Sequence, residues 1–220
     1  MIALVDYGAG NLTSVRKALG AVGARFWTPT HASEIDGATG VIVPGVGHFG
    51  VTAALDDSWR AAILEAMERS VPLLGICVGM QWLFEGSTEA PDVPGLGVVH
   101  GCCRRLEPRG AANVGRPPVP LKIPHVGWNS LTFSRPTRLF AGVPDGAQVY
   151  FTHSYAAPVT AECVASTDHA NTFSSVVERD NIFGVQFHPE KSSDAGLQIL
   201  RNFLRACDAP SPKASAGQRC

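Results

Sequence analysis

Residues 71–80 read Val71-Pro72-Leu73-Leu74-Gly75-Ile76-Cys77-Val78-Gly79-Met80, an apolar run that passes through a glycine-flanked cysteine into a helix-like stretch. The apolar run predicts a buried parallel strand. Gly75 and Gly79 carry no Cβ, so neighbouring elements can approach them closely. This is the pattern of a nucleophile elbow with sulfur in place of oxygen. We expect Cys77 to stand above the sheet at a helix N-terminus, where partial positive charge favours a thiolate.

Outward from the elbow, the first half of the chain alternates apolar strands with helical patterns joined by short links. This order predicts the α/β class, with a mostly parallel central sheet flanked by helices. We expect strands at residues 2–5, 24–28, 41–43 and 73–76, and helices at residues 12–22 and 49–69. Asn11 is the expected N-cap of the first helix.

The second half changes character and predicts a smaller mixed or antiparallel extension of the sheet. The expected strands are residues 97–106, 121–123, 148–151, 162–167, 174–178 and 182–187, followed by a last helix from residue 192 to about 206. Residues 107–120 are rich in Pro, Gly and Arg and predict a surface loop. We place one domain at residues 1–207 and a disordered tail at 208–220, which has few hydrophobic residues.

Bulk composition allows one globular domain of generous size, because 45% of the 220 residues are hydrophobic and 17% are charged. The net charge of −1 and the lack of a long single-sign run do not suggest a nucleic-acid or membrane surface. The N-terminus lacks the pattern of a signal peptide, and the six cysteines show no CxxC spacing, so we expect a cytoplasmic protein with free thiols. His100 and Cys102 are close in sequence, but no set of residues has metal-ligand spacing, and we expect no metal.

A cysteine nucleophile needs a base, and His188 is the best candidate for it. It ends an apolar strand in Gly184-Val185-Gln186-Phe187-His188-Pro189-Glu190, and parallel sheets place their chemistry at such ends. Pro189 biases His188 toward an extended backbone, in which residues i and i+2 face the same side. Glu190 can then hold the imidazole, which predicts a Cys77–His188–Glu190 triad. The other histidines are His31, His48, His100, His125, His153 and His169.

A second glycine-rich stretch, Pro44-Gly45-Val46-Gly47-His48-Phe49-Gly50, contains a literal GxGxxG and could be a dinucleotide site. It follows the third expected strand rather than the first, and no acidic residue stands at a suitable strand end after it. The other interpretation is that it supplies backbone N–H groups to an oxyanion beside the elbow. Trp128, in what reads as a Gly-rich turn, is expected to be exposed and functional.

Together the strings GICVGMQ (75–81), GVQFHPEKS (184–192) and PGVG (44–47) resemble the class I, or triad, glutamine amidotransferases. Three further strings, DYGAGN (6–11), PHVGWN (124–129) and YFTHSY (150–155), are similar to the glutaminase subunits of imidazole glycerol phosphate synthase, the HisH family. The resemblance runs from residue 1 to about 206 and implies a flavodoxin-like amidotransferase fold. It also implies an enzyme without a cofactor that hydrolyses L-glutamine to glutamate and ammonia through a cysteine thioester.

The resemblance further implies roles for individual residues. Cys77 would be the nucleophile, His188 the base and Glu190 its orienting group. The backbone N–H groups of Val46 and Val78 would form the oxyanion site. The remaining residues implied to hold the glutamine head group are Gly47, Gln81, Ser154 and Tyr155.

The resemblance implies a partner as well, a HisF-type cyclase that is a (β/α)8 barrel and forms a heterodimer with this chain. Ammonia would pass to it, and the products would be imidazole glycerol phosphate and AICAR ribonucleotide in histidine biosynthesis. Trp128 and Asn129 are the residues we expect to touch it. Three alternatives stay open: another class I amidotransferase, a non-catalytic scaffold of the same fold, and a nicotinamide-dependent oxidoreductase using Gly45, Gly47 and Gly50.

Overall fold

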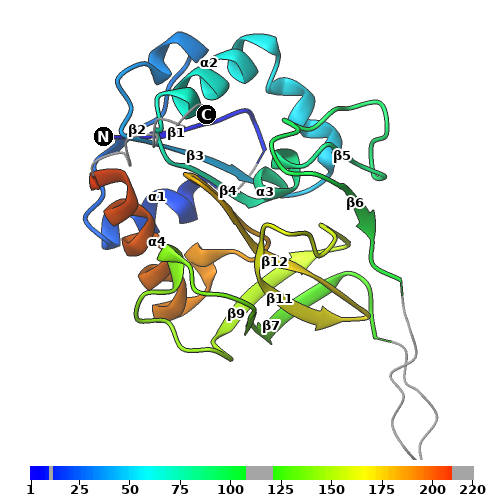
Figure 1. Cartoon of the computed structure of the whole chain (residues 1–220). Coiled ribbons are helices and arrows are strands. Elements are labelled where there is room, and N and C mark those ends of the chain that lie inside the picture. The colour runs from blue at the N-terminus through cyan, green and yellow to red at the C-terminus, as the bar shows by residue number, and fades with distance from the viewer. Residues whose placement is uncertain (10–11, 108–120, 210–220) are drawn as a thin grey trace, which may run out of the picture.

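The computed structural model describes residues 1–9, 12–107 and 121–209. Figure 1 shows a sheet with helices on both sides and strands of the second half below it. One face of the sheet is covered by α1 (Leu12–Ala21) and α4 (Ser193–Asp208), and the other by α2 (Asp57–Glu68) and α3 (Val78–Leu83). Short 3-10 helices are η1 (Ala32–Ile35), η2 (Phe49–Ala54), η3 (Arg138–Phe140) and η4 (Pro189–Lys191).

The central sheet has eight strands within the described residues. In spatial order they are β2 (Phe26–Trp27), β1 (Ile2–Leu4), β3 (Gly40–Gly45), β4 (Leu73–Cys77), β13 (Ile182–Val185), β12 (Asn171–Arg179), β11 (Cys163–His169) and β8 (Thr132–Phe133). The pairs from β2 through β13 are parallel, and those from β13 through β8 are antiparallel. The predicted α/β fold with an antiparallel extension is confirmed.

Two smaller sheets complete the described strands. One joins β5 (Gly86–Ser87), β6 (Cys102–Arg105) and β10 (Tyr155–Ala156). The other is an antiparallel ribbon of β7 (His125–Ser130) and β9 (Gln148–His153), in which His125 faces His153 and Trp128 faces Tyr150. This ribbon lies beside the end of the central sheet that carries the chemistry described below.

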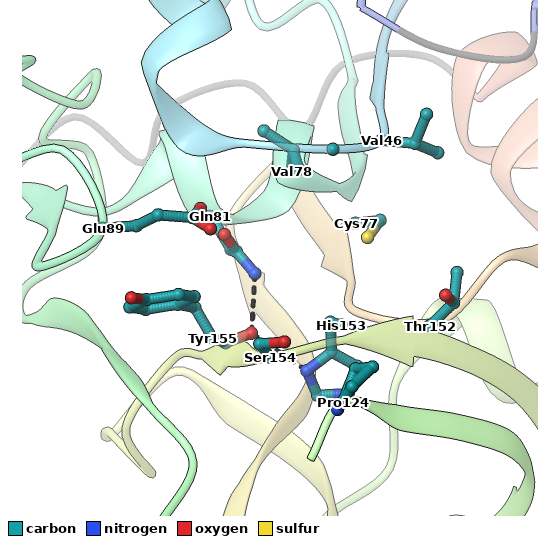
Figure 2. A pocket seen from close by; sticks show the side chains of 11 residues that line it. Val46, Cys77, Val78, Gln81, Glu89, Pro124, Thr152, His153, Ser154 and Tyr155 are labelled. Carbon is teal, nitrogen blue, oxygen red and sulfur yellow. Dashed lines mark hydrogen bonds between the residues drawn. The ribbon is translucent and has the colours of Figure 1, made fainter.

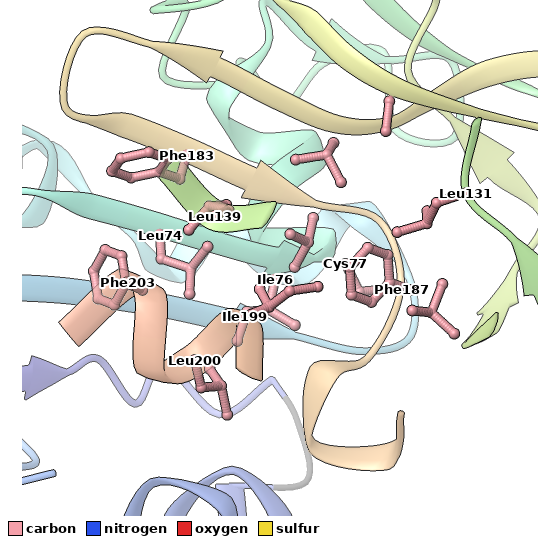
Figure 3. Packing of buried hydrophobic residues seen from close by; sticks show 14 of the residues in the cluster. Leu74, Ile76, Cys77, Leu131, Leu139, Phe183, Phe187, Ile199, Leu200 and Phe203 are labelled. Atoms are coloured by element: carbon pink, nitrogen blue, oxygen red, sulfur yellow. The ribbon is translucent and has the colours of Figure 1, made fainter. Parts of the chain in front are cut away.

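The alternation of side chains along the strands explains the two layers of helices. Ile2 and Leu4 of β1 pack with the α1 and α4 side, whereas Ala3 between them packs with the α2 and α3 side. Figure 3 shows the first layer, where Leu74 and Ile76 of β4 meet an apolar stripe on α4. The stripe consists of Ile199, Leu200 and Phe203. Both faces of β3 and β4 are buried, which is why these strands read as continuous apolar runs.

The pairing of β4 with β13 brings together parts of the chain that lie far apart in sequence. Ile76 is in register with Val185, and Gly75 with Gly184. Because the two strands are parallel, their carboxyl ends meet at the same edge of the sheet. Cys77 ends β4, and the segment that carries His188 leaves β13 beside it.

Some sequence predictions were wrong. The helix expected at 49–69 is two elements, η2 and α2, because the Asp56 side chain accepts hydrogen bonds from the backbone N–H groups of Ser58 and Trp59 and begins a new helix there. The strand expected at 121–123 lies instead at His125–Ser130, which places Trp128 on a strand rather than in a turn. The strand expected at 97–106 is confined to Cys102–Arg105.

Several expectations fall outside the described residues, namely the N-cap at Asn11, most of the loop at 107–120, and residues 210–220 of the tail. Helix α4 continues through Asp208, two residues past the expected end of the last helix. Among the described helices, none has both the length and the apolar character that crossing a membrane requires.

Candidate active site

Cys77 occupies the sharp turn between β4 and α3. Its backbone has φ of +54° and ψ of −108°, a region that non-glycine residues rarely adopt, so the turn is strained as in a nucleophile elbow. The two glycines make the turn possible. A Cβ on Gly75 would lie 2.6 Å from the carbonyl oxygen of Gly79, and a Cβ on Gly79 would overlap the carbonyl oxygen of Val43.

His188 and Glu190 form a buried pair beside this turn. The Nδ1 atom of His188 lies 2.8 Å from Oε1 of Glu190, and the two side chains are 1% and 3% exposed. Nε2 of His188 makes no hydrogen bond to a nitrogen or oxygen of the described residues. Burial disfavours protonation, but the Cys77 thiolate, and the hydrogen bonds to Cys77 and Glu190, outweigh it and raise the pKa of His188 to about 10.

The backbone of His188 is anchored by β9 and by Ser192. Its N–H donates to the carbonyl oxygen of Tyr150 at 2.9 Å, and its own carbonyl oxygen accepts from Oγ of Ser192 at 2.6 Å. The N–H of Tyr150 in turn donates to the same Oγ at 2.9 Å. Ser192 is fully buried, so these contacts hold the imidazole in place without solvent competition.

Two glutamine side chains connect the sulfur to the neighbouring sheet. Nε2 of Gln186 donates to Sγ of Cys77 at 3.6 Å, and its Oε1 accepts from Nε2 of Gln81 at 3.2 Å. Nε2 of Gln81 also donates to the carbonyl oxygen of Tyr155 at 2.8 Å, the hydrogen bond drawn in Figure 2. Both N–H groups of Gln81 are therefore engaged, while its buried Oε1 has no partner among the described residues.

A cavity of about 250 Å³ opens above the sulfur of Cys77 (Figure 2). Glu89 is the one carboxylate in its lining within the described residues, and no Lys or Arg lines it there. The full lining is Val46, Gly47, Cys77, Val78, Gln81, Glu89, Pro124, Thr152, His153, Ser154 and Tyr155. Oε2 of Glu89 accepts a hydrogen bond of 2.7 Å from the N–H of Phe49, which fixes the carboxylate at the edge of the cavity.

The family model of the class-I glutamine amidotransferases matches residues 3–207 of this chain. The chain belongs to this family. Within this family, the chain is 46% identical over 206 residues to the imidazole glycerol phosphate synthase subunit HisH of Moorella thermoacetica. The match covers 92% of this chain and 93% of that protein. The chain is 43% identical over 211 residues to the subunit of the same name from Thermococcus kodakarensis, covering 93% and 100%. At this similarity the chain also belongs with the HisH subunits.

Solved structures support the same fold for the amidotransferase. A crystal structure of a glutamine amidotransferase superposes with a TM-score of 0.70 and 17% identity, covering 94% of this chain and 99% of the other. The structure of PurLQS from Thermotoga maritima gives a TM-score of 0.67 and 18% identity, covering 93% and 97%. At such low identity these two structures support the fold alone.

The amidotransferase fold brings most of the predicted site residues to one place. Val46, Gly47, Val78 and Cys77 line the cavity from one side, with Gln81, Ser154 and Tyr155 also in its lining. His188 and Glu190 do not line it and lie buried beneath. The three residues of the predicted triad therefore come from adjacent parallel strand ends, as the sequence pattern required.

The GxGxxG stretch of the amidotransferase has a different setting from a dinucleotide loop. Gly45 ends β3, and Val46 and Gly47 face the cavity with Cys77. The segment then enters η2, whose N-cap is His48, and not an α-helix whose N-terminus could hold a pyrophosphate. This setting favours the interpretation that the loop serves the elbow.

Sequence reasoning missed Glu89, Thr152, His153 and Gln186 as site residues. Thr152 and His153 could have been found, because they lie inside the string YFTHSY (150–155) that supplied Ser154 and Tyr155. Gln186 precedes His188 by two residues in an extended segment, so it shares the face of the base. Glu89 has no local signal, since its position depends on how the turn after β5 folds back on Phe49.

Proposed function

We propose that this chain is the glutaminase subunit of an imidazole glycerol phosphate synthase. It hydrolyses L-glutamine to glutamate and ammonia and delivers the ammonia to a cyclase subunit, within histidine biosynthesis. The observation that carries the chemical part is the burial of Cys77 beside a histidine whose charge is held by a carboxylate. The HisH names of the relatives support the biological part.

The raised pKa of His188 lets its imidazole hold the proton that Cys77 gives up when the sulfur attacks. The Cys77 thiolate attacks the side-chain amide carbon of glutamine, and a C–S bond forms while the carbonyl electrons move to oxygen. His188 then gives its proton to the departing nitrogen, the C–N bond breaks, and ammonia leaves a glutamyl thioester. The neutral imidazole next takes a proton from water, whose oxygen attacks the thioester and releases glutamate and the thiolate.

The polar atoms of the cavity suit the ammonium end of an amino acid. Glu89 supplies a negative charge, and the unpartnered Oε1 of Gln81 supplies a buried acceptor. A buried acceptor without a partner is costly, so a donor from the substrate stabilises it. Gly47, Ser154 and Tyr155 line the same cavity and are our candidates for holding the carboxylate end.

We assign oxyanion stabilisation to the backbone N–H groups of Val46 and Val78. Val78 directly follows the nucleophile and begins α3, and Val46 lies on the loop after β3 on the same side of the cavity. Donors placed where charge develops act strongly in a site shielded from water.

The cyclase partner would dock on the ribbon of β7 and β9. Val126 and Trp128 alternate on the outer face of β7 and are 56% and 52% exposed. An exposed tryptophan beside a second apolar side chain is typical of an interface anchor. The neighbouring strand β9 carries Thr152 and His153 of the cavity wall, so a barrel docked there would lie close to the site of ammonia release.

The test is glutamate release by the purified chain together with its cyclase and the cyclase ligand. Replacing Cys77 by Ala, or by Ser, should abolish release, because an alanine cannot form a thioester and a serine hydroxyl is a far weaker nucleophile here. Cys102→Ala is the matched control, since that half-buried thiol is free and lies outside the cavity. Undiminished release by the Cys77 variants would remove this residue from the mechanism.

The second test concerns which synthase the chain serves. A HisF-type barrel that stays bound through purification would support the proposed role. Co-purification with the partner of another class I amidotransferase would assign this chain to that reaction and leave the glutaminase chemistry intact.

A further inference from the structure

A line of hydrogen bonds runs from the ribbon to the cavity wall. Nδ2 of Asn129 lies 3.3 Å from Nε2 of His125, and Nδ1 of His125 lies 3.1 Å from Nε2 of His153. Nδ1 of His153 lies 2.9 Å from the carbonyl oxygen of Tyr155. We call these three side chains, Asn129, His125 and His153, the relay. The two histidines are 3% and 7% exposed.

The donor-to-acceptor direction of each hydrogen bond in the relay follows from groups at its two ends whose donor or acceptor role is fixed. The carbonyl oxygen of Tyr155 can only accept, so Nδ1 of His153 carries a proton and its Nε2 is an acceptor. At the other end, Oδ1 of Asn129 accepts from the N–H of Ser130 at 2.8 Å, so Nδ2 is the donor toward His125. Nε2 of His125 is then an acceptor and its Nδ1 a donor, which is what the link to His153 requires.

Every polar atom in the relay is satisfied. The second N–H of Asn129 donates to the carbonyl oxygen of Asp168 at 3.1 Å. Both nitrogens of each imidazole are used, so neither ring can turn or change tautomer without losing a bond. Burial, with neighbouring histidines, lowers the pKa of His125 to about 4 and that of His153 to about 3, and both rings stay neutral at physiological pH.

The same carbonyl oxygen joins the relay to the nucleophile. Tyr155 accepts from His153 on one side and from Nε2 of Gln81 on the other. Gln81 donates in turn to Gln186, and Gln186 donates to the sulfur of Cys77. An unbroken series of hydrogen bonds therefore runs from β7 to the reacting atom.

We propose that His125 and His153 are positioning residues that act through the Tyr155 carbonyl to orient Gln81 and Gln186 around the glutamine site. The proposal rests on the proposed function, because it concerns the efficiency of that reaction. A single tautomer of each ring fixes the carbonyl, and the carbonyl fixes which face Gln81 turns to the cavity.

A packing role is the competing explanation. The ring of His125 stacks on Phe151 at 4.6 Å and on His169 at 3.9 Å between centroids, so any aromatic side chain could fill its place. His125→Phe keeps the ring and removes both nitrogens. His125→Asn keeps a donor near the position of Nδ1 and gives up the ring. A packing role predicts that Phe is tolerated and Asn is not, whereas positioning predicts the reverse.

The first measurement is the tautomer of His153 and His125 in the full chain, from long-range ¹H–¹⁵N spectra of the imidazole rings near pH 7. We expect both rings to be neutral and protonated on Nδ1. In His125→Phe, Nε2 of His153 loses its donor while the Tyr155 carbonyl keeps the proton on Nδ1, so the ¹⁵N shift of Nε2 should move toward that of an acceptor without a hydrogen bond. Asn129→Asp places an acceptor opposite Nε2 of His125, and this ring should become protonated there. A wild-type His153 protonated on Nε2 would overturn the proposal.

The second measurement is kcat/KM for glutamine in the assembled complex. We expect His125→Phe and Asn129→Asp to lower it about tenfold, the factor that corresponds to one lost hydrogen bond, with His125→Asn restoring most of the loss. Urea unfolding shows whether each variant folds. If His125→Phe does not fold, the kcat/KM of Asn129→Asp decides, because Asn129 is only half-buried. Folded Phe and Asp variants with wild-type kcat/KM would contradict positioning.

The spectra need neither glutamine nor a partner, so they separate this proposal from the proposed function. Failure of the proposed function would appear as wild-type protein that releases no glutamate. The rate of Cys77 alkylation, resolved by mass spectrometry, then decides in place of kcat/KM. A rate changed by His125→Phe and recovered in His125→Asn supports positioning, and equal rates in all variants overturn it.

Discussion

Two histidines lie close to the sulfur, and their environments give them opposite properties. His188 is paired with Glu190, which together with Cys77 raises its pKa to about 10. His153 faces the cavity itself, but both its nitrogens are engaged and its pKa is lowered to about 3. His153 lines the cavity and would be the base if position alone mattered. The raised pKa of His188 makes His188 the base instead, because a base must be able to hold a proton.

Glu190→Gln should lower kcat for glutamate release by about 10² or more, because the amide cannot stabilise the imidazolium. The carboxylate raises the pKa of His188, so its loss lowers that pKa. The alkaline limb of the kcat/KM profile should therefore move to lower pH. Steady-state rates from pH 6 to 10 measure the shift. Glu162→Gln, at a half-buried position outside the cavity, is the control, and coincident profiles for Glu190→Gln and wild type would contradict this role.

The buried relay should make the protein sensitive to acid. His125 and His153 have folded-state pKa values of about 4 and about 3, below the ordinary 6.5. As pH falls from 6.5 toward 4, the unfolded chain binds protons that the folded chain does not, so the free energy of unfolding decreases. In His125→Phe the free energy of unfolding should decrease less steeply with falling pH. The slope should be smaller than that of wild type by about 1 kcal/mol per pH unit. Urea unfolding at pH 7, 6 and 5 measures both slopes, and His31→Ala, at an exposed site, should match wild type.

At the scale of elements, the elbow combines β4, α3 and the neighbouring β3 through two glycines. Gly75 packs against Gly79, and Gly79 packs against the backbone of Val43. Each contact joins backbone to backbone, which cannot move aside as a flexible side chain would. The strained φ of Cys77 persists because these contacts determine it from both sides.

Gly79→Ala should prevent stable folding, because its methyl group would overlap the carbonyl of Val43 in the middle of the sheet. Gly20→Ala is the matched variant, since Gly20 lies in α1 with open space around it and no positive φ. That change should stabilise the protein by about 0.5–1 kcal/mol. Thermal unfolding compares them, and a Gly79→Ala protein as stable as wild type would contradict this account of the elbow.

Elements with local signals were predictable from sequence, and those that depend on distant contacts were not. The elbow was predictable because strand, turn and helix signals fall within ten residues around Cys77. The pairing of His188 with Glu190 was predicted from extended backbone at i and i+2, whereas the structure brings the two together across the start of η4, where Nδ1 lies 2.8 Å from the carboxylate. The relay was not, because it depends on the β7–β9 pairing that sets His125 opposite His153. The two histidines lie in the strings PHVGWN (124–129) and YFTHSY (150–155), but neither string indicates that their rings meet.

At the scale of the whole molecule, the ribbon of β7 and β9 lies between the outer surface and the cavity. Its outer face exposes Val126 and Trp128, and the next strand contributes Thr152 and His153 to the cavity wall. A partner bound to this face would therefore lie beside the cavity wall that β9 provides. This arrangement suits a product that must reach a second protein without mixing with water.

Trp128→Ala should weaken binding of the cyclase by about 2 kcal/mol or more, roughly thirtyfold in Kd, because a central exposed tryptophan is a typical interface anchor. Titration calorimetry with the purified cyclase measures the change. Val159→Ala is the control, since Val159 is similarly exposed at 55% but lies off the ribbon. Equal affinities for wild type and Trp128→Ala would place the docking face elsewhere.

The adjacency of β4 and β13 has a consequence for biosynthesis of the chain itself. Although Gln186 touches the sulfur of Cys77, 109 positions separate them along the polypeptide. A growing chain on the ribosome thus exposes a thiol early, long before the imidazole that would activate it has been translated. Nascent and truncated products are consequently unable to consume glutamine, and two separately expressed fragments divided between these strands should regain activity only when they reassociate.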